Sequence, residues 1–132
     1  MGNRLIFVLF VLLTFPSVAQ VKPYSVNGTD GVILDWKKRS VNLLTINNDR
    51  IEVTSKEVEL FEKAFNQKYA DYKDFKRQYL GYRENGKTFL AVILISPKLA
   101  KTTGWKKREV ACMDCVGFSI VVFDIESGTI KF

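Results

Sequence analysis

The sequence predicts an α+β domain in which one helix packs across a twisted antiparallel sheet. Three observations support this class: a capping box that opens an amphipathic helix at Thr54, an Asn85-Gly86 turn between two apolar runs, and further strand-like segments before and after the helix. Residues 20–132, a stretch of 113 residues, are the size of one domain. We therefore expect the helix and the sheet to share a single hydrophobic core.

Residues 1–19 have the form of a secretory signal peptide. Arg4 supplies the positive start, residues 5–15 form an apolar run, and Pro16-Ser17-Val18-Ala19 is a small-residue exit. Eleven apolar residues ended by a proline are too few for a membrane-spanning helix, which needs about 20. We expect cleavage after Ala19 and a periplasmic or extracellular protein. No cysteine lies near the cleavage site, so no lipid anchor is expected. No membrane span is expected after cleavage.

The helix is predicted to start at Thr54-Ser-Lys-Glu57, where each end residue can bond the backbone of the other. Apolar side chains then recur at helical spacing, and most charged side chains fall outside that stripe. The stripe consists of Val58, Phe61, Phe65 and Tyr69, with Leu60 and Ala64 beside it, while Lys56, Glu59, Glu62, Lys63 and Lys68 are assigned to the polar face. Such a stripe is either ordinary core or the lining of a ligand pocket.

The segments after the helix are predicted to be strands. Residues 75–82 and 88–95 should pair around Asn85-Gly86, and the second run is apolar on both faces, which is typical of a central strand. Residues 105–112 and 115–124 should form a second hairpin about Met113-Asp114, followed by a short strand over 129–132.

Shorter strands are expected before the helix, over 32–36, 41–46 and 50–53. Residues 20–31 contain a proline and an Asn-Gly-Thr sequence and are expected to form a loose N-terminal lead-in. The predicted organisation is a signal peptide over 1–19, a lead-in over 20–31 and a single α+β domain over 32–132.

A resemblance to a known group follows from this order of elements over residues 54–132. An aromatic-rich helix, a strand with Gly81-Tyr82, a Gly86-Lys87 turn, Trp105-Lys106-Lys107 and a last strand over 118–124 together resemble small exported Bacteroidota proteins with a cystatin-like layout. The resemblance implies a fold and no activity. The Gln-x-Val-x-Gly hairpin with which cystatins block proteases is absent, so protease inhibition is not implied.

Cys112 and Cys115 flank the predicted turn at Met113-Asp114. The residues after Cys115 have a strand pattern, so no helix terminus lowers a thiol pKa as in redox pairs of the thioredoxin type. A structural zinc site needs four ligands, and the chain has two thiols and no histidine. A disulfide across the turn and a pair of free or semi-buried thiols remain as the two interpretations.

Two six-residue segments differ at one position. Residues 36–41 read Trp-Lys-Lys-Arg-Ser-Val and residues 105–110 read Trp-Lys-Lys-Arg-Glu-Val. In one interpretation the two segments lie on adjacent strands and present a platform for an anionic or sugar-bearing partner. In the other, the cations protect sheet edges while each tryptophan is buried. The candidate binding residues are Trp36, Lys37, Lys38, Arg39, Trp105, Lys106, Lys107 and Arg108.

The composition excludes several function classes. The chain has no histidine, which removes the usual general base, a common metal ligand and the usual pH switch. Without Arg4, the mature chain carries 19 basic and 14 acidic side chains, a net charge of +5. That charge favours anionic partners but is too small to predict nucleic-acid binding. No cofactor and no metal ion is predicted.

The sequence therefore predicts an exported, non-catalytic binding domain whose partner is a protein, a glycan or an anionic envelope component. The alternative is an unusual enzyme that uses carboxylates in place of histidine, for example on a glycan. No spacing singles out a pair among the available acids, which are Glu57, Glu59, Glu109, Asp124 and Glu126.

Overall fold

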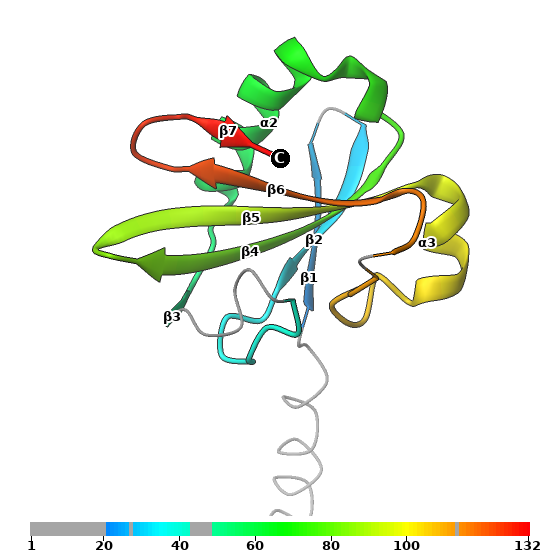
Figure 1. Ribbon diagram of the computed structural model, residues 1–132, viewed down its shortest axis with the longest axis horizontal. Helices are drawn as coiled ribbons and strands as arrows, with labels where there is room; N and C mark the ends of the chain where they lie inside the picture. The colour runs from blue at the N-terminus through cyan, green and yellow to red at the C-terminus, as the bar shows by residue number, and fades with distance from the viewer. Residues whose placement is uncertain (1–20, 27, 43–48, 113) are drawn as a thin grey trace, which may run out of the picture.

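The computed structural model describes residues 21–26, 28–42, 49–112 and 114–132 and confirms an α+β fold (Figure 1). The helices are α2 (Ser55–Lys68), the 3-10 helix η1 (Ala70–Tyr72) and α3 (Pro97–Thr103). The strands are β1 (Val21–Val26), β2 (Thr29–Leu34), β3 (Asp49–Ile51), β4 (Lys76–Glu84), β5 (Lys87–Ile95), β6 (Phe118–Asp124) and β7 (Ile130–Lys131). Predicted features at residues 1–20, at 43–46 and at Met113 lie outside the described residues.

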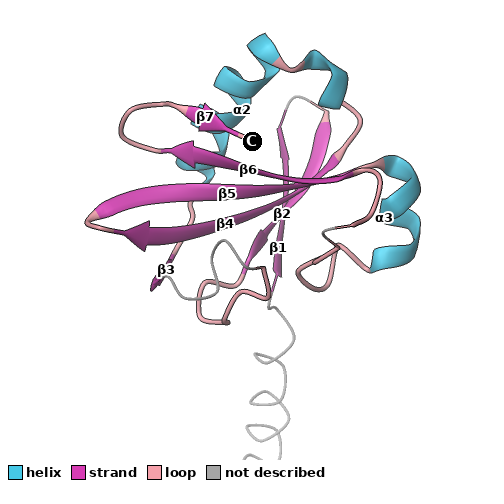
Figure 2. Ribbon diagram, in the orientation of Figure 1, coloured by secondary structure: helices cyan, strands magenta, loops and turns pink. Residues whose placement is uncertain are grey.

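All the described strands belong to one sheet in the order β1-β2-β4-β5-β6-β7, with β3 beside β4 (Figure 2). Every described pairing is antiparallel except that of β2 with β4, where residues 31–33 run parallel to 77–79. The prediction of a purely antiparallel sheet was therefore wrong. Helix α2 lies between β2 and β4 in the chain, and β4 runs in the same direction as β2. A parallel pair of strands requires such a crossover connection.

Two hydrophobic layers sandwich the sheet. On one face α2 contributes Val58, Phe61 and Phe65, all fully buried. On the other face Trp105 and Val110 pack on the sheet beside the half-buried residues of α3. A second helix thus covers the face opposite α2, where one helix was predicted.

The predicted start of the long helix is confirmed. The backbone N–H of Thr54 donates to the Glu57 carboxylate at 3.2 Å, and the helix runs from Ser55 to Lys68. The predicted hairpin is also confirmed, since Glu84 pairs with Lys87 across a turn in which Asn85 and Gly86 have φ of 52° and 78°. Strand β5 lies between β4 and β6, and its residues 90–95 are all buried, as expected of a central strand.

The predicted loose lead-in forms ordered strands instead. Residues 21–26 make β1, which pairs with β2 around Gly28, whose φ is 79°. Pro23 is tolerated because β1 is the edge strand of the sheet. Gly31 lets β2 approach β4, since a Cβ at this position would lie 2.5 Å from a ring carbon of Tyr79.

The second predicted hairpin is only half present. Residues 118–124 form β6, but residues 105–112 are turns and irregular backbone. The chain between β5 and this segment forms α3, capped by Ser96, whose hydroxyl accepts from the Leu99 N–H at 3.2 Å, and followed by Gly104 at φ 65°. Residues 105–112 therefore pack on a face of the sheet, where Trp105 and Val110 are buried, and do not extend its edge.

The shorter strands are also displaced from their predicted bounds. The strand expected over 32–36 is β2, which ends at Leu34, and the one expected over 50–53 is β3. Val41 and Asn42, the described part of the segment expected over 41–46, are not in a strand. Neither α2 nor α3, the two α-helices of the described chain, is long and apolar enough to cross a membrane.

Candidate functional site

The two Trp-Lys-Lys-Arg segments meet at one cleft of about 280 Å³. Each segment contributes its second lysine and its arginine to the wall. The cleft is lined by Leu34, Asp35, Lys38, Arg39, Val41, Arg50, Lys107, Arg108 and Glu109. Five cations and two carboxylates therefore line this space, which leaves a local charge of about +3.

The contact between the two segments lies at the one position where their sequences differ. The Ser40 hydroxyl donates to Glu109 Oε2 at 2.7 Å. Asn42 extends the contact, because its backbone N–H donates to the same oxygen at 3.2 Å and its side-chain amide donates to Glu109 and, at 3.1 Å, to the Val110 carbonyl. A serine at 109 or a glutamate at 40 could not form this donor–acceptor pair in the same sense.

The second segment is held on the sheet by Gln78. This β4 side chain is fully buried, and its amide donates to the carbonyls of Trp105 and Arg108, both at 2.7 Å. Its carbonyl oxygen accepts from the Val110 N–H at 2.8 Å. One side chain thus supplies hydrogen-bond partners to three backbone groups of a segment that belongs to no strand.

The first segment is held by Arg50 of β3. Its Nε donates to the Gly81 carbonyl at 3.1 Å and its Nη1 to the Lys38 carbonyl at 2.8 Å. Its Nη2 is buried and has no hydrogen-bond partner among the described residues. Burial lowers the pKa of Arg50, and Glu109 and Asp35 oppose that shift by charge attraction. The two hydrogen bonds to backbone carbonyls thus fix the position of the Arg50 guanidinium in the wall of the cleft.

A tight turn carries the exposed part of the first segment. Lys38 N–H donates to the Asp35 carbonyl at 3.1 Å, and Lys37 N–H donates to the Asp35 carboxylate at 3.0 Å. Trp36 and Lys37 occupy the two central positions of this turn and are exposed. They lie next in sequence to the cleft-lining residues Asp35 and Lys38.

Trp105 and Lys106 face a different part of the surface. They line a hollow of about 370 Å³ beside β1 and β2. The Nζ atoms of Lys76 and Lys106 lie 6.0 and 5.7 Å from the centre of the Trp105 ring. The structure therefore divides the eight predicted residues: Lys38, Arg39, Lys107 and Arg108 share one cleft, Trp36 and Lys37 lie in the adjoining turn, and Trp105 and Lys106 belong elsewhere.

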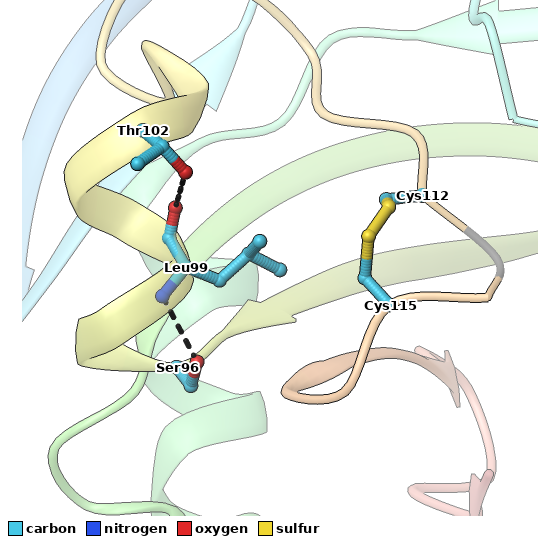
Figure 3. Close-up of a disulfide and its surroundings, with 5 residues drawn as sticks. All are labelled: Ser96, Leu99, Thr102, Cys112 and Cys115. Carbon is cyan, nitrogen blue, oxygen red and sulfur yellow. Dashed lines mark hydrogen bonds between the residues drawn. A yellow bond between two sulfur atoms is a disulfide. The ribbon is translucent and has the colours of Figure 1, made fainter.

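Cys112 and Cys115 form a disulfide, with their Cα atoms 5.4 Å apart (Figure 3). The bridge closes a turn in which the Cys115 N–H donates to the Cys112 carbonyl at 3.1 Å. Figure 3 shows the bridged loop next to α3. Two residues after Cys115, the Gly117 carbonyl accepts from the N–H of Ser96, the N-cap of α3, at 2.8 Å. The chain continues from this turn into β6, so no helix begins at either cysteine.

Three of the five acids considered for catalysis are engaged in local structure. Glu57 caps α2, Glu59 accepts from the Tyr24 hydroxyl at 2.7 Å, and Asp124 accepts from the backbone N–H groups of Glu126 and Ser127. The hydrogen bond from the Ser127 backbone lowers the pKa of Asp124. Glu109 alone of the five lines the cleft, together with Asp35. Within the described part of the chain, no three Cys, Asp or Glu side chains are placed to hold one metal ion.

Three polar residues that organise the site were not predicted from the sequence. Asn42, Arg50 and Gln78 each hold a segment through its backbone, and no short motif identifies them. The lysine and arginine pairs were identified because the repeated segment is visible in the sequence. The arrangement can hold an anion between the two segments by charge. No family model, curated protein or solved structure matches the chain, so its function must be argued from this cleft.

Proposed function

We propose that the protein is an exported, non-catalytic binding domain that holds an anionic ligand in the cleft between its two Trp-Lys-Lys-Arg segments. The observation that carries the proposal is the 2.7 Å hydrogen bond from Ser40 to Glu109, which joins segments far apart in the chain so that their cations line one space. Charges of one sign in the wall of a cleft raise the local concentration of ligands of the opposite sign.

Export is supported by the signal-peptide pattern of residues 1–19 and by the Cys112–Cys115 disulfide, since disulfides persist mainly in oxidising compartments. The intact mass of protein recovered from the cell envelope or the medium tests this part of the proposal. A chain beginning at Gln20 with no acyl mass is expected. Retention of residues 1–19 or an attached lipid would contradict it.

The non-catalytic role is supported by how the cleft carboxylates are used. Glu109 Oε2 accepts from Ser40 and from the backbone of Asn42, and the Asp35 carboxylate accepts from Lys37 N–H. Both acids thus hold local backbone or side chains in place.

Anion binding can be tested with acetate and inorganic phosphate as probes, followed by backbone amide shifts in NMR. Shifts are expected in 35–41 and 105–110, and they should weaken as sodium chloride is added because exposed charges are screened. Lys107→Ala should lower the affinity by up to about fivefold, the range of an exposed charge contact. Lys101→Ala on α3 removes the same charge from an exposed site outside the cleft and serves as the matched control.

Equal losses in the two variants would show that net charge alone attracts the anion, and an absence of shifts in both segments would overturn the proposal.

A further inference from the structure

The two near-identical segments allow an internal comparison, because the same apolar residues are buried in one copy and exposed in the other. Trp105 and Val110 are each 6% exposed and belong to the core. Their counterparts Trp36 and Val41 are 40% and 56% exposed. The first copy therefore leaves a tryptophan and a valine on the surface that the fold itself does not cover.

One of these exposed apolar groups lines the cationic cleft, and the other lies in the adjoining turn. Val41 lines it, the buried side chain of Leu34 lines it as well, and Trp36 sits in the turn between Asp35 and Lys38. The methylene stems of the lining lysines and arginines add further apolar wall. An anion with no apolar part would leave this surface in contact with water, at a cost proportional to the exposed area.

The charges restrict the polar end of the ligand. Arg50 is held in place by two backbone carbonyls, and its Nη2 has no partner among the described residues. Asp35 and Glu109 offset two of the five cations in the lining, so the cleft stays positive and attracts an anionic group.

The volume restricts the apolar end. A cavity of about 150 Å³ accepts benzene, and the cleft measures about 280 Å³. It can therefore enclose a group roughly twice the size of benzene, such as one medium-length acyl chain or one amino-acid residue. A polymer could place only about one residue in this space.

We infer that the cleft binds a carboxylate on a compact apolar body, with the carboxylate among the cations of both segments and the apolar body against Leu34 and Val41. This inference rests on the anion-binding function proposed above and names the ligand class. Two sources share this chemistry: a free acyl carboxylate and the C-terminal residue of a peptide.

Straight-chain carboxylates test the apolar half of the inference. Titration of the full chain with acetate, butanoate, hexanoate and octanoate should show affinity rising about fourfold per methylene until the cleft is filled. N-acetyl-leucine represents the peptide source. If it binds tighter than hexanoate, the ligand is a peptide end, and if it binds more weakly, the ligand is an acyl chain.

Val41→Asn places a polar group of similar size in the wall and should weaken octanoate binding about tenfold, a much larger loss than for acetate, which has only a methyl group to place against this wall. Leu60→Asn is the matched control, since Leu60 is another exposed large hydrophobic residue and lies on α2 outside the cleft. Because both positions are exposed, neither change should prevent folding.

The outcomes separate this inference from the function on which it rests. Equal affinity for acetate and octanoate, or equal losses in Val41→Asn and Leu60→Asn, would overturn the amphipathic ligand and leave anion binding intact. Failure of every probe, with no amide shifts in residues 35–41 and 105–110, would overturn both.

Discussion

Glu62 of α2 and Arg77 of β4 form an ion pair with no solvent exposure, with Arg77 Nε 3.2 Å from Glu62 Oε2. Tyr79 donates its hydroxyl to the same carboxylate oxygen at 3.0 Å, and Arg77 Nη1 donates to the carbonyls of Tyr72 and Phe75, both at 2.8 Å. The pair thus connects the helix to the sheet inside the apolar layer formed by Phe61 and Phe65.

Removing one partner of this pair should be costly, because the other charge then remains buried and uncompensated. We expect Glu62→Leu to lower the free energy of unfolding by about 3–5 kcal/mol, and Glu62→Leu combined with Arg77→Met to cost less than Glu62→Leu alone. Asp30→Asn breaks the exposed Lys76–Asp30 pair and should cost no more than about 1 kcal/mol. Urea denaturation measures all of these, and a stable Glu62→Leu variant would contradict the role of the pair.

The same cluster predicts a loss of stability at alkaline pH. Burial raises the pKa of Tyr79 far above its usual value, and the negative charge of Glu62 adds to the shift. The folded state therefore keeps a proton that the unfolded state loses above about pH 10. Stability contributed by the neutral phenol is complete below that pH and should fall by about 1.4 kcal/mol per pH unit above it.

Urea midpoints measured from about two pH units below the ordinary tyrosine pKa to about one unit above it test this dependence. Tyr79→Phe should be less stable at neutral pH, because Glu62 loses a donor. It should also show a flatter decline above about pH 10. An unchanged slope in this variant would assign the alkaline transition to another group.

The aromatic stripe of α2 is core, so its loss should appear in stability. Phe61 is fully buried, stacks on Phe65 with ring centres 5.0 Å apart and meets Phe123 edge-on at 5.6 Å. Phe61→Ala should cost about 3–5 kcal/mol. Lys63→Ala, on the exposed face of the same helix, should change stability by no more than about 0.5 kcal/mol. Chemical denaturation of the two variants compares them directly, and equal stabilities would contradict the packing.

Gln78 should control how firmly the second cationic segment is held. Gln78→Leu leaves the carbonyls of Trp105 and Arg108 and the N–H of Val110 without this partner. We expect a loss of at least about 2 kcal/mol and faster hydrogen exchange at the Val110 amide. Gln67→Leu, an exposed change on α2, is the control and should leave that amide protected. Unchanged exchange in Gln78→Leu would show that packing alone holds the segment.

The Cys112–Cys115 disulfide should be structural and unreactive. A loop this short contributes only about 2 kcal/mol by the chain-entropy argument, so the double serine variant should fold with a modest loss. Among the described residues no helix begins at either cysteine, as it does in redox pairs of the thioredoxin type. Insulin reduction should therefore proceed at the uncatalysed rate in the presence of the wild-type protein. A faster rate that returns to the uncatalysed rate in the Cys112→Ser variant would contradict this expectation.

The burial of Glu62 could have been predicted only in part from the sequence. Glu62 was assigned to the polar face, yet it is four residues after Val58 and three before Phe65, which places it on the buried side of the helix. Its charge indicated a surface position, and its partner Arg77 lies on another element.

The first hairpin could also have been predicted. Asn27-Gly28 carries the same hairpin signal as Asn85-Gly86, but a neighbouring proline indicated a loose segment.

The sequence by itself determined the capping box and start of α2, the β4–β5 hairpin, the central place of β5 and the strand that ends in Asp124. These features follow from residues within about one helix or hairpin of each other, so periodicity and turn chemistry are sufficient to indicate them.

Only the tertiary structure decided that β2 runs parallel to β4, that the two Trp-Lys-Lys-Arg segments meet, and that one copy is buried while the other is exposed. Ser40 and Glu109 are 69 residues apart, and their contact depends on where Gln78 and Arg50 hold the backbone against the sheet. The local sequence of the two segments is nearly the same, so it cannot specify their different burial. The packing of the whole chain around one sheet sets that difference.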